Sequence, residues 1–143
     1  MKEKLLVSAC LLGIPCRYNG ETKKDEPVCA LADRYELVPV CPEVLGGLKT
    51  PREPSEIRGR RVYTKSGEDV TGEYEEGARR ALIIAMKNGC KKAVLKEKSP
   101  SCGSGLIHNG LFDGGLVPGD GVTARFLKIY GMEVYGETEI DNL

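Results

Sequence analysis

Residues 4–10 read Lys-Leu-Leu-Val-Ser-Ala-Cys, an apolar run that ends in small residues. Such a run predicts a buried strand over residues 4–9, because strands that are buried on both faces are short and almost continuously apolar. Residues 37–40 and 92–96 carry similar apolar runs, and residues 133–135 predict a further short strand. We therefore expect a largely buried sheet.

Helical patterns separate these strands. The clearest covers residues 71–88, where Gly89 is placed to end the helix. Its apolar residues at helical spacing are Tyr74, Ala78, Ala81, Leu82, Ala85 and Met86. Residues 27–35 and 122–130 predict two shorter helices. Because alternating strands and helices are typical of α/β proteins, the sequence predicts a three-layer sandwich with a mainly parallel, Rossmann-like sheet.

The 143 residues have the length of one domain, which we expect over residues 1–143. Lys and Arg together number 21, and Asp and Glu together also number 21, so the formal net charge is zero. The net charge therefore gives no general argument for binding to nucleic acid or acidic membranes. The first ten residues are too briefly apolar for a signal peptide, and no run approaches the roughly 18 residues of a membrane span. A cytoplasmic location is expected.

Two segments predict loops. Residues 42–61 are rich in Pro, Gly and charged residues, and residues 97–121 are rich in Gly. Loops of this length in a short chain are often functional. The acidic tail from residue 137 is expected to fray.

Six cysteines are unusual for such a chain. Without an export signal, thiols at this density are more often ligands or reagents than disulfides. Cys10 and Cys41 each follow a predicted strand, and Cys102 lies in the loop after a third. The carboxyl ends of parallel strands share one edge of a sheet, so we expect these thiols to meet there. The alternative is that they are ordinary small buried residues.

Three thiolates suit a cubane iron–sulfur cluster, because they leave one iron open as a Lewis acid for a soft sulfur atom. A closed structural zinc site normally takes four ligands. Cys16 could be a fourth ligand of the cluster, a thiol that accepts sulfur, or an ordinary packed residue. We favour a position beside the cluster. Cys29 and Cys90 are expected to be structural. His108 is the only histidine, and a lone loop histidine is usually just solvated.

Several motifs resemble those of one protein family, in order and spacing, over essentially the whole chain. They are Ser8-Ala-Cys-Leu-Leu-Gly13, Cys16-Arg-Tyr-Asn-Gly20, Cys41-Pro-Glu43, Gly47-Leu-Lys-Thr-Pro-Arg52 with Pro54 and Glu56, Gly67-Glu-Asp-Val-Thr71 and Lys98-Ser-Pro-Ser-Cys-Gly103. The chain resembles the small cysteine-rich domains that include the thiouracil desulfurases. Asn19 departs from the pattern, since Asp is expected there.

The resemblance implies an oxygen-sensitive [4Fe–4S] cluster on Cys10, Cys41 and Cys102. It also implies that the fourth iron takes the thiocarbonyl sulfur of a thiolated pyrimidine while water replaces it, without net redox change. Relatives that act on thiouridine in transfer RNA usually carry an additional domain. Because we see neither that domain nor positive net charge, free 2-thiouracil is the expected substrate.

Exchanging C=S for C=O also needs a positioned water and a proton carrier. The candidates are Glu43, two residues after a proposed ligand, and Ser99 and Ser101, which flank another. The serines alternatively cap backbone N–H groups or hydrogen-bond to cluster sulfur, and Glu43 alternatively is an exposed loop carboxylate. The motif cations that are candidates for substrate binding, or else for surface ion pairs, are Arg17, Arg52 and Lys98.

Three other functions compete with this interpretation. The chain is alternatively a non-catalytic carrier of sulfur or metal, a cofactor-free thiol enzyme, or a structural zinc domain. The sequence does not indicate which partner would assemble the cluster or accept the sulfur.

Overall fold

The computed structural model describes residues 2–143. Its central sheet has four parallel strands in the order β2-β1-β5-β8. Their bounds are β1 Glu3–Ser8, β2 Tyr35–Val40, β5 Lys92–Leu95 and β8 Glu133–Gly136. The predicted α/β class and parallel sheet are confirmed.

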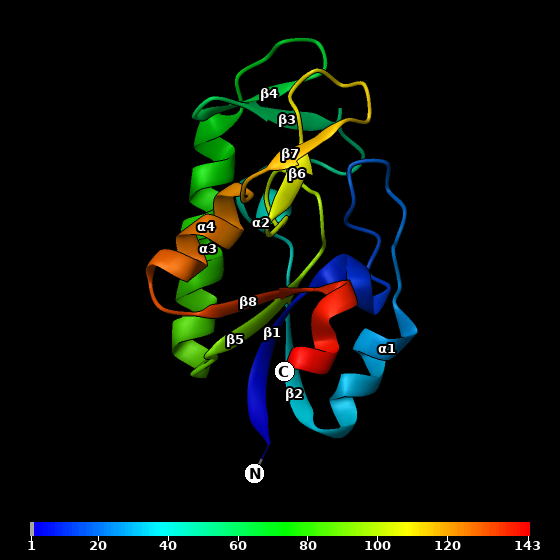
Figure 1. Ribbon diagram of the computed structural model, residues 1–143, viewed down its shortest axis with the longest axis vertical. Coiled ribbons are helices and arrows are strands. Elements are labelled where there is room, and N and C mark those ends of the chain that lie inside the picture. The colour runs from blue at the N-terminus through cyan, green and yellow to red at the C-terminus, as the bar shows by residue number, and fades with distance from the viewer. Residues whose placement is uncertain (1) are drawn as a thin grey trace.

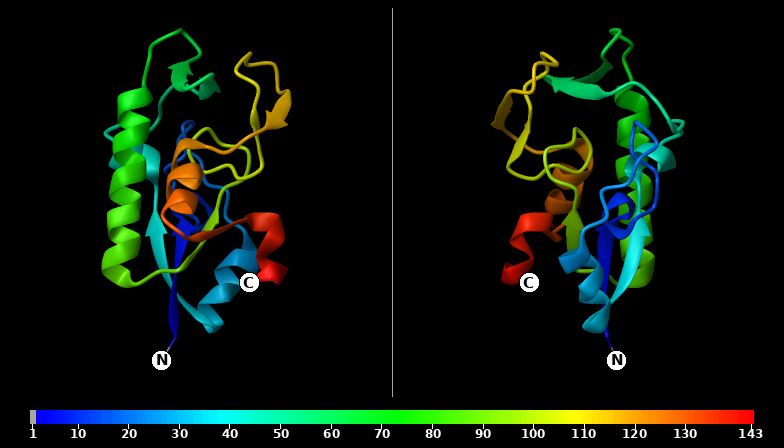
Figure 2. Two further views of the ribbon diagram at one scale, coloured as in Figure 1. Left: turned by 60° about the vertical axis from the view of Figure 1, so that its left-hand side comes forward. Right: turned by 90° about the vertical axis from the view of Figure 1, so that its right-hand side faces the viewer.

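Helices and helical turns cover both faces of this sheet, as Figures 1 and 2 show. One face packs against α3 (Thr71–Asn88) and α4 (Val122–Ile129). The other packs against α1 (Glu26–Cys29) and the 3-10 turns η1 (Ala9–Leu12), η2 (Ala30–Asp33) and η3 (Glu137–Asn142). No helix within residues 2–143 is both long and apolar enough to cross a membrane.

The strand residues alternate between two cores. Leu6 packs with Leu82 and Leu127 on the α3–α4 face, while Leu5 and Val7 pack toward α1 and η1. All are buried, and successive side chains of a strand point to opposite faces. Strand β1 is therefore buried between the two helical layers, and this burial fixes the position of its carboxyl end.

Both segments that were predicted as loops contain regular structure, so those predictions were partly wrong. Residues 42–61 include the one-turn helix α2 (Pro42–Leu45) and strand β3 (Ser55–Arg58), which pairs with β4 (Arg61–Thr64). The glycine-rich segment forms a second antiparallel hairpin, β6 (Leu106–His108) with β7 (Leu116–Pro118). We call these two hairpins the roof hairpins, because they lie beyond the carboxyl ends of the central strands (Figure 1).

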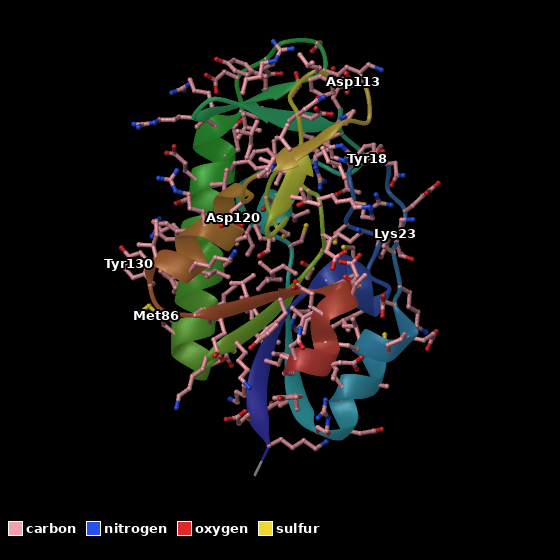
Figure 3. All side chains as sticks on the ribbon, in the orientation of Figure 1. Tyr18, Lys23, Met86, Asp113, Asp120 and Tyr130 are labelled. Atoms are coloured by element: carbon pink, nitrogen blue, oxygen red, sulfur yellow. The ribbon has the colours of Figure 1, made fainter. Side chains whose placement is uncertain are left out.

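The helix predicted over residues 71–88 is confirmed, and Gly89 ends it in the left-handed conformation with φ 69°. Met86 follows the helical spacing of the apolar residues but does not belong to the buried stripe of this helix. It is 68% exposed, and Figure 3 shows it on the outer side of α3. Ala85 already occupies the buried stripe, and the next residue is rotated away from it by about 100°.

The acidic tail is ordered as η3 and does not fray. Glu139 accepts a hydrogen bond from the Gly136 N–H (2.8 Å), and Thr138 donates to Glu97 through both its N–H and its hydroxyl. Glu137 forms an ion pair with Lys96 at 2.9 Å. Glu97 and Lys96 lie about forty residues earlier in the chain, so local sequence patterns do not reveal these two partners.

Candidate functional site

A cavity of about 370 Å³ lies beyond the carboxyl ends of β1, β2 and β5, with the roof hairpins on its far side. From β1 the chain passes over one face of the sheet to β2, whereas it returns to β5 through α3 on the other face. Open α/β sheets bind their ligands at such a change of direction, outside the carboxyl edge. The topology alone therefore marks this cavity as the candidate site.

Four thiols line the cavity: Cys10, Cys16, Cys41 and Cys102. Cys10 lies in η1 directly after β1, and Cys41 is the N-cap residue of α2 directly after β2. Cys102 lies in the loop that follows β5. The structure thus brings together the three cysteines that were expected at one edge, and their role as ligands stays a prediction.

Cys16 lies between two of these thiols. Its thiol is within hydrogen-bonding reach of those of Cys10 and Cys41, and the Cys41 thiol also donates to the Cys16 carbonyl oxygen at 3.7 Å. Among the alternatives for Cys16, this position supports a thiol beside the proposed ligands.

Three of these thiols have a raised pKa, which disfavours a role as nucleophiles. Hydrogen bonding with Cys10 raises the pKa of Cys16, and hydrogen bonding with Cys16, followed by burial, raises the pKa of Cys41. Burial raises the pKa of the Cys102 thiol to about 12. Reactive cysteines have a lowered pKa instead, whereas a metal can displace the proton from a buried thiol.

The arrangement of the thiols fits a cluster better than a single ion. Within residues 2–143, no three His, Cys, Asp or Glu side chains converge closely enough to hold one metal ion. All four thiols instead line the same cavity. A [4Fe–4S] cluster takes its thiolate ligands on separate iron atoms, so it suits thiols that surround a space.

Glu43 lies in the first turn of α2 and is held by two partners. Its Oε1 accepts hydrogen bonds from the Tyr74 hydroxyl (2.8 Å) and from Arg52 Nε (3.1 Å). The side chain of Glu43 is 18% exposed and that of Arg52 is 9% exposed, so this ion pair is largely removed from solvent. Glu43 is therefore not an exposed loop carboxylate. Burial is the main cause that raises the pKa of Tyr74, which keeps its hydroxyl a donor to Glu43.

Arg52 is committed to contacts within the protein. Besides Glu43, it donates to the carbonyl oxygens of Cys16 (2.9 Å) and Lys49 (3.0 Å) and to the Thr50 hydroxyl (3.1 Å). These bonds fix the loop that carries Cys16 against α2. The structure therefore supports a positioning role for Arg52 more directly than the predicted substrate contact.

The helix α2 packs unusually closely on α3, through Gly46 at the C-terminal end of α2 and Gly77 of α3. A Cβ atom on Gly77 would collide with the Pro42 carbonyl oxygen, and one on Gly46 would collide with the Glu73 carbonyl oxygen. Only glycine allows the two backbones to approach so closely. This contact fixes the position of Cys41 and Glu43, which lie on either side of Pro42.

We expect Gly77→Ala to lower the free energy of unfolding by about 1–3 kcal/mol, because the added methyl group must push α2 away from α3. Alanine normally stabilises a helix interior by about 1 kcal/mol relative to glycine, so the expected sign is unusual. Urea unfolding would measure the effect. Gly72→Ala is the matched control on the same helix, since no atom lies within 4 Å of the position that its new methyl group would take. Equal stabilisation by both variants would contradict the proposed contact.

The two predicted serines have different surroundings. Ser99 lines the cavity, and its hydroxyl accepts a hydrogen bond from the Cys102 N–H at 2.6 Å. Ser101 is not among the lining residues. It is buried, and its hydroxyl hydrogen-bonds with Thr123 at the start of α4 (2.9 Å). Both serines thus shape the loop around Cys102, and a direct catalytic role remains a prediction.

The other two predicted cations, Arg17 and Lys98, also line the cavity. Arg17 stacks over the Tyr18 ring at 5.6 Å from its centroid. Lys98 is exposed and has φ 71°, which is uncommon for a residue with a side chain and often accompanies functional loops.

Sequence patterns missed Ser8, Glu56 and Tyr74, which also line the cavity. Tyr74 has the helical spacing of a core residue, and only its hydroxyl reaches the site. Ser8 ends β1 and accepts a hydrogen bond from the Lys96 N–H at 2.9 Å, across the strand ends. Glu56 could have been found from the sequence, because it belongs to the family motif that follows Arg52. Cys29 and Cys90 are not among the lining residues, in agreement with a structural role.

The chain is similar to known proteins over almost its whole length. Residues 5–139 match the family described as 2-thiouracil desulfurase. The uncharacterized protein YbbK of Bacillus subtilis (strain 168) is 46% identical over 97% of this chain and 99% of its own. A solved structure of the [4Fe-4S]-dependent thiouracil desulfidase TudS superposes with a TM-score of 0.94 at 46% identity, covering 99% of this chain and 95% of that one.

Proposed function

This chain belongs to the 2-thiouracil desulfurase family, and on that premise we propose that it removes sulfur from 2-thiouracil or a close relative with a [4Fe–4S] cluster. Water enters, C=S becomes C=O and hydrogen sulfide leaves, so no oxidant or reductant is consumed. The observation that carries the proposal is the meeting of thiols from three separate strand ends around one cavity. Their chemistry suits the cluster, since thiolates are the ligands of iron–sulfur centres.

Cys10, Cys41 and Cys102 would hold the cluster, with Cys16 beside it. When bound through three thiolates, the cluster supplies one iron with no protein ligand, a Lewis acid with affinity for sulfur. The protein supplies the remaining requirements. The Ser99 hydroxyl holds the backbone of Cys102 in place.

Glu43 would hold and transfer a proton at its carboxylate. Arg52 and Tyr74 both bind Oε1, and no hydrogen bond within residues 2–143 reaches Oε2. The second oxygen therefore remains available to a water molecule or to the substrate. A carboxylate fixed in this way can accept a proton from the attacking water and return it to the departing sulfur. Arg17 and Lys98 would contact the polar groups of the substrate.

We further propose that the protein acts in the cytoplasm. All six cysteines are free, and thiols of this number persist in a reducing compartment. Free thiolated bases are the proposed substrate, and thiolated transfer RNA is the alternative. A steeply salt-dependent affinity would reveal the nucleic acid.

The test is anaerobic reconstitution, followed by measurement of iron and acid-labile sulfide and by an assay of uracil formed from 2-thiouracil. We expect equal iron and sulfide, together with stoichiometric uracil and hydrogen sulfide. Exposure to air or removal of iron by a chelator should abolish the activity. A carrier would bind the cluster but form no uracil, and a cofactor-free thiol enzyme would keep its activity after chelation.

A further inference from the structure

His108 has a hydrogen-bonding capacity that the folded chain does not use. It is the only histidine, it lies at the end of β6, and it lines the same cavity as the four thiols. Its Nδ1 is enclosed without a hydrogen-bond partner, and within residues 2–143 no other enclosed side-chain nitrogen or oxygen lacks one. Such an exception in a folded protein requires an explanation, and functional sites often provide it.

The other ring nitrogen is available to a ligand. Nε2 makes no hydrogen bond within residues 2–143, and unlike Nδ1 it is not enclosed. The imidazole therefore borders the cavity with one accessible nitrogen that nothing in the described chain occupies. The solvated loop histidine that the sequence pattern favours does not describe this position.

The backbone around His108 is held firmly. Glu56 of β3 is only 7% exposed, and its Oε1 accepts hydrogen bonds from the N–H groups of Gly110 (2.9 Å) and Phe112 (3.1 Å). Arg58 donates to the Gly110 carbonyl oxygen at 2.8 Å. Gly110 has φ 89°, and a Cβ atom there would lie 2.7 Å from the Ile57 carbonyl oxygen, so this approach requires glycine. The two roof hairpins are thus clipped together directly beside His108.

The proposed substrate carries a hydrogen-bond acceptor that could bind to Nε2 of His108. Besides its C=S group, 2-thiouracil carries a carbonyl oxygen that the reaction leaves in place. Arg52 already donates to four acceptors within the protein, and Lys98 is exposed, whereas His108 is held and unpaired. An N–H donor that would otherwise remain unpaired favours a ligand that carries the matching acceptor.

We propose, resting on the function proposed above, that His108 is a specificity-determining residue whose Nε2 donates a hydrogen bond to the retained carbonyl oxygen of the pyrimidine. The clip formed by Glu56 keeps the backbone beside His108 in place for this contact. The enzyme then selects thiolated bases that also carry an oxo group.

The test compares two substrates in anaerobically reconstituted enzyme: 2-thiouracil, and pyrimidine-2-thione, which lacks the carbonyl group. We expect His108→Phe to lower kcat/KM for 2-thiouracil by about 10- to 100-fold and to leave that for pyrimidine-2-thione within about twofold. His108→Gln, whose side-chain amide can donate a hydrogen bond, should recover part of the loss.

Binding gives a second readout that does not depend on turnover. Calorimetry should show that His108→Phe weakens binding of uracil by the same factor and leaves binding of pyrimidin-2-one unchanged, with cluster absorbance equal to wild type. Equal losses for the ligands with and without the carbonyl group, or no loss for either, would overturn the proposal. Failure of the wild-type enzyme to convert 2-thiouracil would instead refute the proposed function, so the two failures are distinguishable.

Discussion

Cys102→Ala should abolish cluster binding and desulfuration together. Cys102 is only 6% exposed, and it lies in a loop that the hydrogen bonds of Ser99 and Ser101 shape. Loss of one of three ligands leaves a second iron without protein coordination. We expect reconstituted protein to lack the absorbance of the cluster and to form no measurable uracil.

Cys29→Ala is the matched control. Cys29 is outside the cavity, and its thiol donates to the Leu11 carbonyl oxygen at 3.6 Å. Its replacement should leave cluster absorbance and activity at wild-type levels and affect stability at most. Full activity of Cys102→Ala would refute the ligand assignment, and loss of absorbance in Cys29→Ala would show that the wrong thiols were chosen.

Glu43→Gln should keep the cluster and lower turnover by about 100- to 10,000-fold, the usual range for loss of a general acid–base group. Glutamine has the same shape, and its carbonyl oxygen can still accept the hydrogen bonds from Tyr74 and Arg52. The fold should therefore survive while proton transfer is lost. Single-turnover formation of uracil, measured beside cluster absorbance, separates these effects.

Glu76→Gln provides the control for removal of a charged carboxylate. Glu76 forms ion pairs with Arg79 and Arg80 on the exposed face of α3, and such surface pairs contribute little to stability. The Glu76→Gln variant should match the wild type in uracil formation and in cluster absorbance. A near-normal rate in Glu43→Gln would remove this carboxylate from the mechanism and leave it a structural partner of Arg52.

The sheet and the meeting of the cysteines were predictable, because both depend on local signals. Apolar runs specify the buried strands, and the parallel arrangement brings residues 10, 41 and 102 to one edge. The helix over residues 71–88 likewise follows from spacing and a terminal glycine. These features need no knowledge of distant contacts.

The rest depends on contacts between residues far apart in the chain. The clip between Glu56 and Gly110 spans 54 positions, and the bond between Thr138 and Glu97 spans 41. The β6 and β7 strands have three residues each, too few to show an alternating pattern. Segment 97–121 and the tail were therefore interpreted from composition alone, and His108 was taken for a solvated side chain.

The glycine contact between α2 and α3 makes one wall of the cavity intolerant of substitution, whereas another wall tolerates substitution better. Cys41 and Glu43 are anchored to the longest helix through backbone atoms that leave no room for a side chain. The β6–β7 hairpin instead exposes Leu106, Leu116 and Val117 to solvent. Directed evolution toward bulkier thiolated compounds should therefore concentrate its mutational libraries on the exposed residues of this hairpin, keep His108, and leave residues 41–46 and 73–77 untouched.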